Sequence, residues 1–270
     1  MKRAKAKVYN FFIFLSEIFL KILNDIGGMA YLASEITNWS LVMVFKKKEA
    51  RRGEFTKNIL DYGLGAIPII GIIMFLIGFI SALQSAAQLR MVGGNIFVAD
   101  LLAIGMTAEM GPLMAAIIVA GRSGSAIASE IATMKFTEEL DALQTMGLNP
   151  TKFVMVPKMW ALICAMPILT MFANAMGILG GTVIGVTYLK ISFSAFWQEL
   201  THALMFEHII SGTVKSICFG ALITIIGCHK GLRFKGGADG VGRATTASVV
   251  TAIFYIIAAD SFLGLVFYFR

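Results

Sequence analysis

Three ionisable residues lie inside stretches of the chain that are otherwise strongly apolar: Glu109, Lys215 and Asp260. A charged side chain in hydrocarbon costs at least about 2.5 to 3.5 kcal/mol, so each should face protein, water or an opposite charge. Because two are acidic and one is basic, the three can converge on one polar cluster in the outer half of a membrane. Such a cluster would be a structural ion pair between helices, a gate or ligand contact on a transport path, or a proton relay.

The other reactive side chains form no catalytic or metal-binding pattern. Cys164, Cys218 and Cys228 lie in or beside apolar stretches without a Cys-x-x-Cys pair, which is typical of small core residues, and the three histidines are scattered. The glycine-rich turn at 236–242 has neither the Gly-x-x-x-x-Gly-Lys-Ser/Thr nor the Gly-x-Gly-x-x-Gly order of a nucleotide-binding loop. The sequence therefore predicts a chain that is not itself an enzyme and that holds no metal or cofactor of its own.

A charged tract at 123–150 separates two of the apolar stretches and is longer than a simple loop requires. Thr137 is a plausible N-cap, Gly147 suits the position just after a helix, and Pro150 prevents continuation, so a short helix is predicted at the membrane surface. Three apolar residues recur along one of its sides: Leu140, Leu143 and Met146. This helix would either rest among lipid headgroups or dock a soluble partner, and the pattern does not separate the two.

The elements that must position these residues are membrane-spanning helices. The chain is 57% hydrophobic and only 14% charged, and several apolar runs exceed the roughly eighteen residues that suggest a transmembrane helix. This composition predicts an all-α polytopic membrane protein with five crossings. We place them at about 65–89, 101–120, 153–188, 209–227 and 244–268. The third is longer than a bilayer core, so it should project beyond the membrane or bend at Pro167.

Two further patterns concern packing and the N-terminal region. Gly177, Gly181 and Gly185 repeat every fourth residue, which lets another helix approach closely, and packing within the chain is favoured over a subunit interface. Residues 1–57 are predicted to form a separate cytoplasmic and interfacial region, with an amphipathic helix over about 8–26 lying in the membrane surface.

Lysine and arginine are distributed unevenly along the chain. Nineteen fall in the N-terminal region, in the tract with its flank and in the last turn, whereas only three lie on the opposite side: Arg90, Lys190 and Arg270. Because cytoplasmic loops carry the excess of positive charge, this distribution predicts that the N-terminus, the tract and the last turn are cytoplasmic.

Several ordered motifs resemble the signature of the MlaE/YrbE permease family. They are EMGP at 109–112, AGRSGSAIASE at 120–130, TMK at 133–135, EELDAL at 138–143 and MGLNP at 146–150. Members of that family are membrane subunits of ABC transporters that move phospholipids, or related lipids, between the inner and outer membranes of diderm bacteria and into chloroplasts. The resemblance extends from about residue 55 to the end of the chain, and no shared motif is found before Lys57.

The resemblance implies a permease domain over 58–270 in a bacterial inner membrane. If the charge cluster of Glu109, Lys215 and Asp260 is a gate or a headgroup contact, it lies on the lipid path of that domain. The resemblance also implies a cytoplasmic ABC ATPase that holds ATP and Mg, a second copy of the chain, a periplasmic MCE-domain protein and a small STAS-type cytoplasmic subunit. Residues of the tract would couple the ATPase to the spans: Arg122, Glu130, Lys135, Glu138, Glu139 and Asp141.

A rival interpretation from another class is an ion-coupled secondary transporter that uses the three intramembrane charges as a proton-linked relay. Five spans without a visible inverted repeat, together with the elaborate charged tract, disfavour it. A purely structural scaffold would leave the intramembrane charges without a purpose.

Overall fold

The computed structural model describes Ser16, Leu20 and residues 23–41 and 52–269. The chain divides into two compact units, Met1–Glu49 and Ala50–Arg270. In the first unit residues 23–41 are helical, and most of the amphipathic helix predicted at 8–26 lies outside the described residues. The second unit includes helix α2 (Arg52–Tyr62), which packs against helix α8 (Val156–Thr187) of the same unit. The domain boundary at residue 58 stays a prediction.

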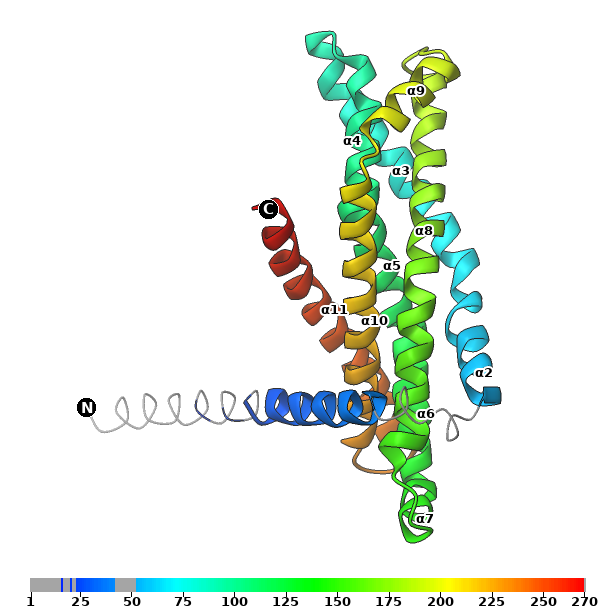
Figure 1. Ribbon diagram of the computed structural model, residues 1–270, viewed down its shortest axis with the longest axis vertical. Helices are drawn as coiled ribbons and strands as arrows, with labels where there is room; N and C mark the ends of the chain where they lie inside the picture. The colour runs from blue at the N-terminus through cyan, green and yellow to red at the C-terminus, as the bar shows by residue number, and fades with distance from the viewer. Residues whose placement is uncertain (1–15, 17–19, 21–22, 42–51, 270) are drawn as a thin grey trace, which may run out of the picture. The chain divides into compact units, whose positions relative to one another are not determined.

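The predicted all-α polytopic architecture is confirmed. Every regular element in the described residues is helical, and five helical runs among them are long and apolar enough to cross a membrane (Figure 1). These runs are Phe55–Val92, Asn95–Phe136, Thr151–Thr187, Phe206–Leu232 and Asp239–Phe267. The first run continues from α2 through η1 (Leu64–Ala66) and α3 (Ile67–Leu89) to η2 (Arg90–Val92).

The second run is one continuous helical rod with irregular turns. It comprises η3 (Asn95–Phe97), α4 (Val98–Ile104), the π-helical η4 (Gly105–Met110), α5 (Gly111–Val119), the π-helical η5 (Ala120–Gly124) and α6 (Ser125–Phe136). The first half of the predicted surface tract, residues 123–136, is therefore not a separate short helix but an extension of the span. At about 1.5 Å per residue the rod is roughly 60 Å long, twice the hydrocarbon core, so it must project beyond the membrane.

The short helix α7 (Glu139–Thr145) is present, but the prediction that Thr137 caps it is wrong. The Thr137 hydroxyl donates instead to the carbonyl of Thr133, so this residue closes α6, and Glu138 makes the turn with φ of 59°. The other end is as predicted: Gly147 has φ of 74°, and the amides of Gly147 and Leu148 donate back to Gln144 and Leu143. These bonds form the Schellman motif that ends a helix.

The third run passes through Pro167 without interruption, since η6 (Thr151–Met155) leads into α8, which contains Pro167. Helix α9 (Phe193–Ala203) begins at Ser192, whose side chain accepts from the amide of Ala195. Two long helices complete the unit, α10 (Phe206–Leu232) and α11 (Ala238–Tyr268). Helices α7 and α9 lie at opposite ends of the second unit (Figure 1).

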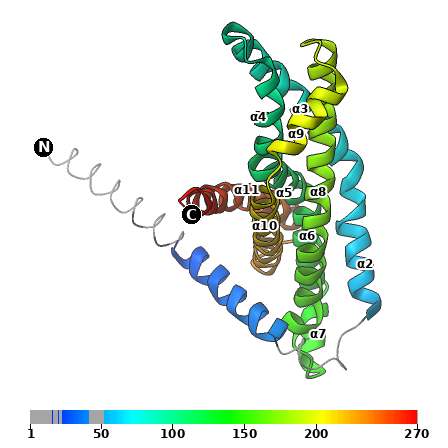
Figure 2. The same cartoon turned by 45° about the horizontal axis from the view of Figure 1, so that its top comes forward.

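Close backbone contacts hold the helices together. Helix α3 lies along α8, α10 packs on α8, and α11 starts against α10 and α6 and then leans away toward its C-terminus (Figure 2). A Cβ atom at Gly78 would lie 1.8 Å from the carbonyl oxygen of Gly177, and one at Gly180 would lie 2.0 Å from that of Phe75. The remaining glycines of the predicted stripe, Gly181 and Gly185, contact Leu102 and Phe196 of the same chain. Among the cysteines, Cys228 is buried as predicted, but Cys164 is exposed.

Candidate functional site

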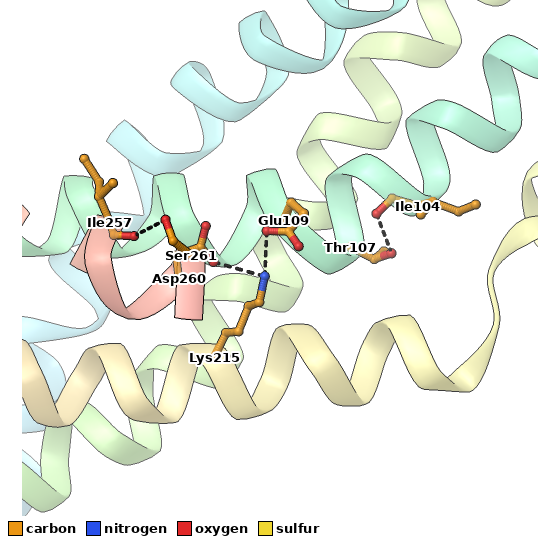
Figure 3. Close-up of polar contacts among 7 residues, drawn as sticks. All are labelled: Ile104, Thr107, Glu109, Lys215, Ile257, Asp260 and Ser261. Carbon is orange, nitrogen blue, oxygen red and sulfur yellow. Dashed lines mark hydrogen bonds and ion pairs between the residues drawn. The ribbon is translucent and has the colours of Figure 1, made fainter. Parts of the chain in front are cut away.

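The three intramembrane charges come together. The Lys215 ammonium on α10 lies 2.6 Å from Oε2 of Glu109 in η4 and 3.0 Å from Oδ1 of Asp260 on α11 (Figure 3). The Lys215 side chain is 0% exposed, that of Asp260 13% and that of Glu109 48%. One fully enclosed cation is therefore shared by two carboxylates from different spans, and the cluster carries an excess of one negative charge when all three groups are ionised.

Local backbone features place Glu109 at this position. Pro112 has no amide hydrogen, so the α-helical bond from residue 112 back to residue 108 cannot form, and the preceding turn widens into the π-helical η4. Gly212 lets α10 approach that turn, since a Cβ there would lie 2.3 Å from the carbonyl oxygen of Thr107. Helix α11 also covers the cluster, and it comes close at Gly264, where an added Cβ atom would lie 3.6 Å from Glu109 Oε1.

A cavity of about 580 Å³ opens beside the cluster, and the half-exposed Glu109 is one of its walls. Its lining combines apolar side chains with acids and a histidine: Ile104, Ala108, Glu109, Glu207, His208, Ile210, Ser211, Gly264 and Phe267. A cavity of this composition suits an amphiphilic ligand, because it offers apolar surface for hydrocarbon and a few fixed polar groups for a headgroup.

The structure contains a second charge cluster that the sequence reasoning missed. Lys158 on α8 has a side chain only 2% exposed, and its ammonium lies 2.7 Å from Oε2 of Glu130 on α6. The Tyr62 hydroxyl on α2 donates to the same carboxylate oxygen at 2.5 Å and accepts from Lys158 at 3.1 Å. The sequence signal for this cluster is that Lys158 stands inside the third predicted crossing, at 153–188, where a charge is rare.

The six predicted coupling residues fall into two groups. Three contact other helices of the chain: Arg122 donates to the carbonyl of Asp61, Glu130 belongs to the second cluster, and Lys135 donates to the carbonyl of Leu232. The other three lie on the solvent side of α7 or at its start: Glu138, Glu139 and Asp141. The first group therefore joins helices, whereas the second is free to meet another molecule.

These features define a class, a polytopic helical membrane protein with charges enclosed between its spans and a cavity beside them. The chain belongs to the MlaE permease family, since the family model described as Permease MlaE matches residues 55–266. It is 36% identical to a probable ABC transporter permease protein of Rickettsia typhi, over 76% of this chain and 79% of that one. It is 31% identical to the intermembrane phospholipid transport system permease protein MlaE of Haemophilus influenzae, over 74% and 77% of the two chains.

A plant relative is also similar. The chain is 32% identical to the chloroplastic protein TRIGALACTOSYLDIACYLGLYCEROL 1 of Arabidopsis thaliana, over 71% of this chain and 55% of that one. The matched region in this chain contains all three intramembrane charges, the second charge cluster and α7, since they lie within residues 55–266.

Proposed function

We propose that the chain is the permease subunit of an ABC transporter that moves phospholipids, or related lipids, between the inner and outer membranes of a bacterium. The observation that carries this proposal is the cavity of about 580 Å³ beside an enclosed charge cluster, in a chain of the MlaE permease family. The Haemophilus relative, whose printed name specifies intermembrane phospholipid transport, supports the choice of cargo.

The cluster of Glu109, Lys215 and Asp260 lies on the proposed lipid path as a gate. The closed state of this gate is favoured while Glu109 and Asp260 share Lys215, because separating the helices that carry them would leave charges unpaired in hydrocarbon. A headgroup that enters beside Glu109 is able to compete for Lys215 through its phosphate, or for the carboxylates through an amine. Lipid entry is then linked to movement of η4, α10 and α11 relative to one another.

The energy source is proposed to be a separate cytoplasmic ATPase that binds ATP and Mg. Glu138, Glu139 and Asp141 give α7 an exposed acidic surface at the end of the unit opposite α9. Most of the basic residues of the second unit belong to the α7 end, which supports a cytoplasmic location for that end. The lysines and arginines of the N-terminal region support the proposal that the N-terminus is also cytoplasmic, and the membrane is proposed to be the bacterial inner membrane. The proposed assembly further contains a second copy of the chain, a periplasmic MCE-domain protein and a small STAS-type subunit.

The test is lipid transfer by the chain, co-purified with its ATPase and reconstituted into liposomes that contain a fluorescent phospholipid. Asp260→Asn keeps the side-chain shape but removes one charge, and we expect ATP-dependent transfer to fall about tenfold, the effect of about 1.4 kcal/mol on a rate. Asp239→Asn, in the first turn of the same helix, is the matched control and should transfer lipid normally. Transfer driven by a proton gradient without ATP would instead favour the ion-coupled rival.

A further inference from the structure

The second charge cluster joins three helices that are far apart in the sequence. We call the residues Tyr62, Glu130 and Lys158 the α6 junction; they come from α2, α6 and α8. The Lys158 ammonium lies 3.1 Å from the Tyr62 hydroxyl oxygen and 2.7 Å from Oε2 of Glu130, so the hydroxyl and the carboxylate share one enclosed cation. A buried cation held by a carboxylate and a hydroxyl is costly to separate, because each group would lose its partner away from water.

The turn before α6 strengthens the same connection. Arg122 donates to the carbonyl of Asp61 at 3.1 Å, and the buried Ser123 hydroxyl donates to the carbonyl of Tyr62 at 2.7 Å. These are carbonyls at the C-terminal end of α2, which a helix leaves without internal partners. Gly65 then packs against the Arg122 guanidinium, so close that a Cβ would overlap it. The rod of the second span is thereby fastened to the point where α2 passes into α3.

Helix α6 is thus tied at both ends of its length. Near its start it holds α2 and α8, and near its end Lys135 donates to the carbonyl of Leu232 at the close of α10. By contrast α7 is joined to α6 through the Thr137–Glu138 turn and contacts few other elements of the described chain. A displacement of α7 reaches the spans at both of its ends, through the Thr137–Glu138 turn into α6 and through residues 146–150 into η6 and α8. The first span has no such chain connection to α7, so movement reaches α2 from α6 through the junction.

We propose that Tyr62, Glu130 and Lys158 are positioning residues that transmit movement of α6 to the first and third spans. Glu130 then acts inside the chain, on Lys158 and Tyr62, and not as a contact for the ATPase. The junction itself rests on the observed contacts, whereas the source of the movement, nucleotide binding by an ATPase, rests on the proposed function.

Tyr62→Phe is the most conservative test, because it removes one hydroxyl and keeps the ring. Tyr188→Phe is the matched control, since the Tyr188 hydroxyl accepts from Arg90 at the α9 end of the unit. A second variant, Glu130→Gln with Lys158→Met, removes both charges together and so leaves no unpaired ion. It replaces Tyr62→Phe if that variant does not fold.

The measurement is amide hydrogen exchange of the complex with its ATPase, with and without a non-hydrolysable ATP analogue. In the wild type we expect the analogue to change exchange in α6, in residues 52–66 and in α8. In Tyr62→Phe the response of α6 should remain, while the response of residues 52–66 should become smaller than in the wild type, because one of the contacts that tie α2 to α6 is lost and the two bonds to the carbonyls of Asp61 and Tyr62 remain. The Tyr188→Phe complex should respond like the wild type.

Two results would overturn the proposal in distinguishable ways. If residues 52–66 respond in Tyr62→Phe as strongly as in the wild type, the junction does not transmit the movement, although the proposed function stands. If the wild-type complex shows no nucleotide response in any helix, the proposed coupling to an ATPase fails, and the transmission role fails with it.

Discussion

Lys215 supplies the positive charge that the carboxylates of Glu109 and Asp260 share between the spans. Its side chain has no exposed surface, and its ammonium is within ion-pair distance of both Glu109 and Asp260. The bond to Glu109 forms at the edge of the cavity, whereas Asp260 is almost enclosed. The two carboxylates are thus not equivalent: Asp260 anchors the cation, and Glu109 is the partner that a ligand in the cavity is able to reach.

Removing the cation should destabilise the fold more than removing the whole cluster. We expect Lys215→Met to lower the free energy of unfolding by about 3 to 5 kcal/mol, because two carboxylates remain without a counter-charge. Adding Glu109→Gln and Asp260→Asn should restore most of that loss. Thermal unfolding in detergent, followed by the loss of the monodisperse size-exclusion peak, measures both variants. A Lys215→Met protein as stable as the wild type would contradict the expected charge balance.

The sequence identifies the charged residues that lie inside apolar runs, but it predicts only some of the side chains that they contact. Glu109, Lys215 and Asp260 are conspicuous because charge is rare inside spans, and their opposite signs favoured convergence. The α6 junction was missed because Tyr62 is an ordinary residue near a membrane surface and because Lys158 is close to the start of its span. Which side chains meet across three helices depends on helix rotation, and periodicity does not fix that rotation when all faces are apolar.

At the scale of the helices, glycine determines how closely the spans approach. The contact between Gly78 and Gly177 brings α3 and α8 together with almost no side chain between them. We expect Gly78→Ala to lower the free energy of unfolding by about 1 to 3 kcal/mol, since the added methyl group meets backbone that cannot rotate away. Gly121→Ala is the control, because nothing lies within 4 Å of its Cβ position. Equal unfolding temperatures for the two variants would contradict this packing.

Helix α7 is where a soluble partner is expected to bind. Glu139→Lys with Asp141→Lys reverses its exposed charge, and we expect ATPase association to weaken at least about tenfold while membrane insertion is retained. Gln198→Lys, on the exposed surface of α9 at the other end, should leave association unchanged. Co-purification of the tagged variants with the ATPase gives the answer. Undiminished association would show that α7 is an interfacial helix and not a docking helix.

The helix boundaries were predictable where capping residues are explicit and not where the helix simply continues. Gly147 and Pro150 fixed the end of α7, because one adopts positive φ and the other cannot continue a helix from the preceding turn. The second crossing is predicted to end near residue 120, where glycine and serine accumulate, but the helical run extends from Asn95 to Phe136. Instead these small residues form the π-helical η5, which lets α6 continue along the same rod.

For the molecule as a whole, the two ends differ in charge. The α9 end of the described second unit carries Arg90 and Lys190, and Arg90 is held against the Tyr188 hydroxyl. The end with α7 has more basic residues, on α2, α6 and the turn between α10 and α11. This difference predicts that α7 lies in the cytoplasm and α9 in the periplasm.

Labelling with a membrane-impermeant maleimide checks this orientation. In a variant whose three native cysteines are replaced by alanine, Gln144→Cys on α7 and Ser194→Cys on α9 are both on exposed residues. We expect intact cells with a permeabilised outer membrane to label Ser194→Cys, and inverted inner-membrane vesicles to label Gln144→Cys. Labelling of both positions from the same side would contradict the orientation.

The most direct test of the central claim, an ATP-driven lipid permease, is affinity purification of the tagged chain in mild detergent, followed by mass spectrometry of bound proteins and lipids. We predict recovery of an ABC ATPase together with phospholipid, and loss of the ATPase but not of the lipid in the Glu139→Lys, Asp141→Lys variant. Recovery of the chain without an ATPase and without phospholipid, after equally gentle extraction, would contradict the account.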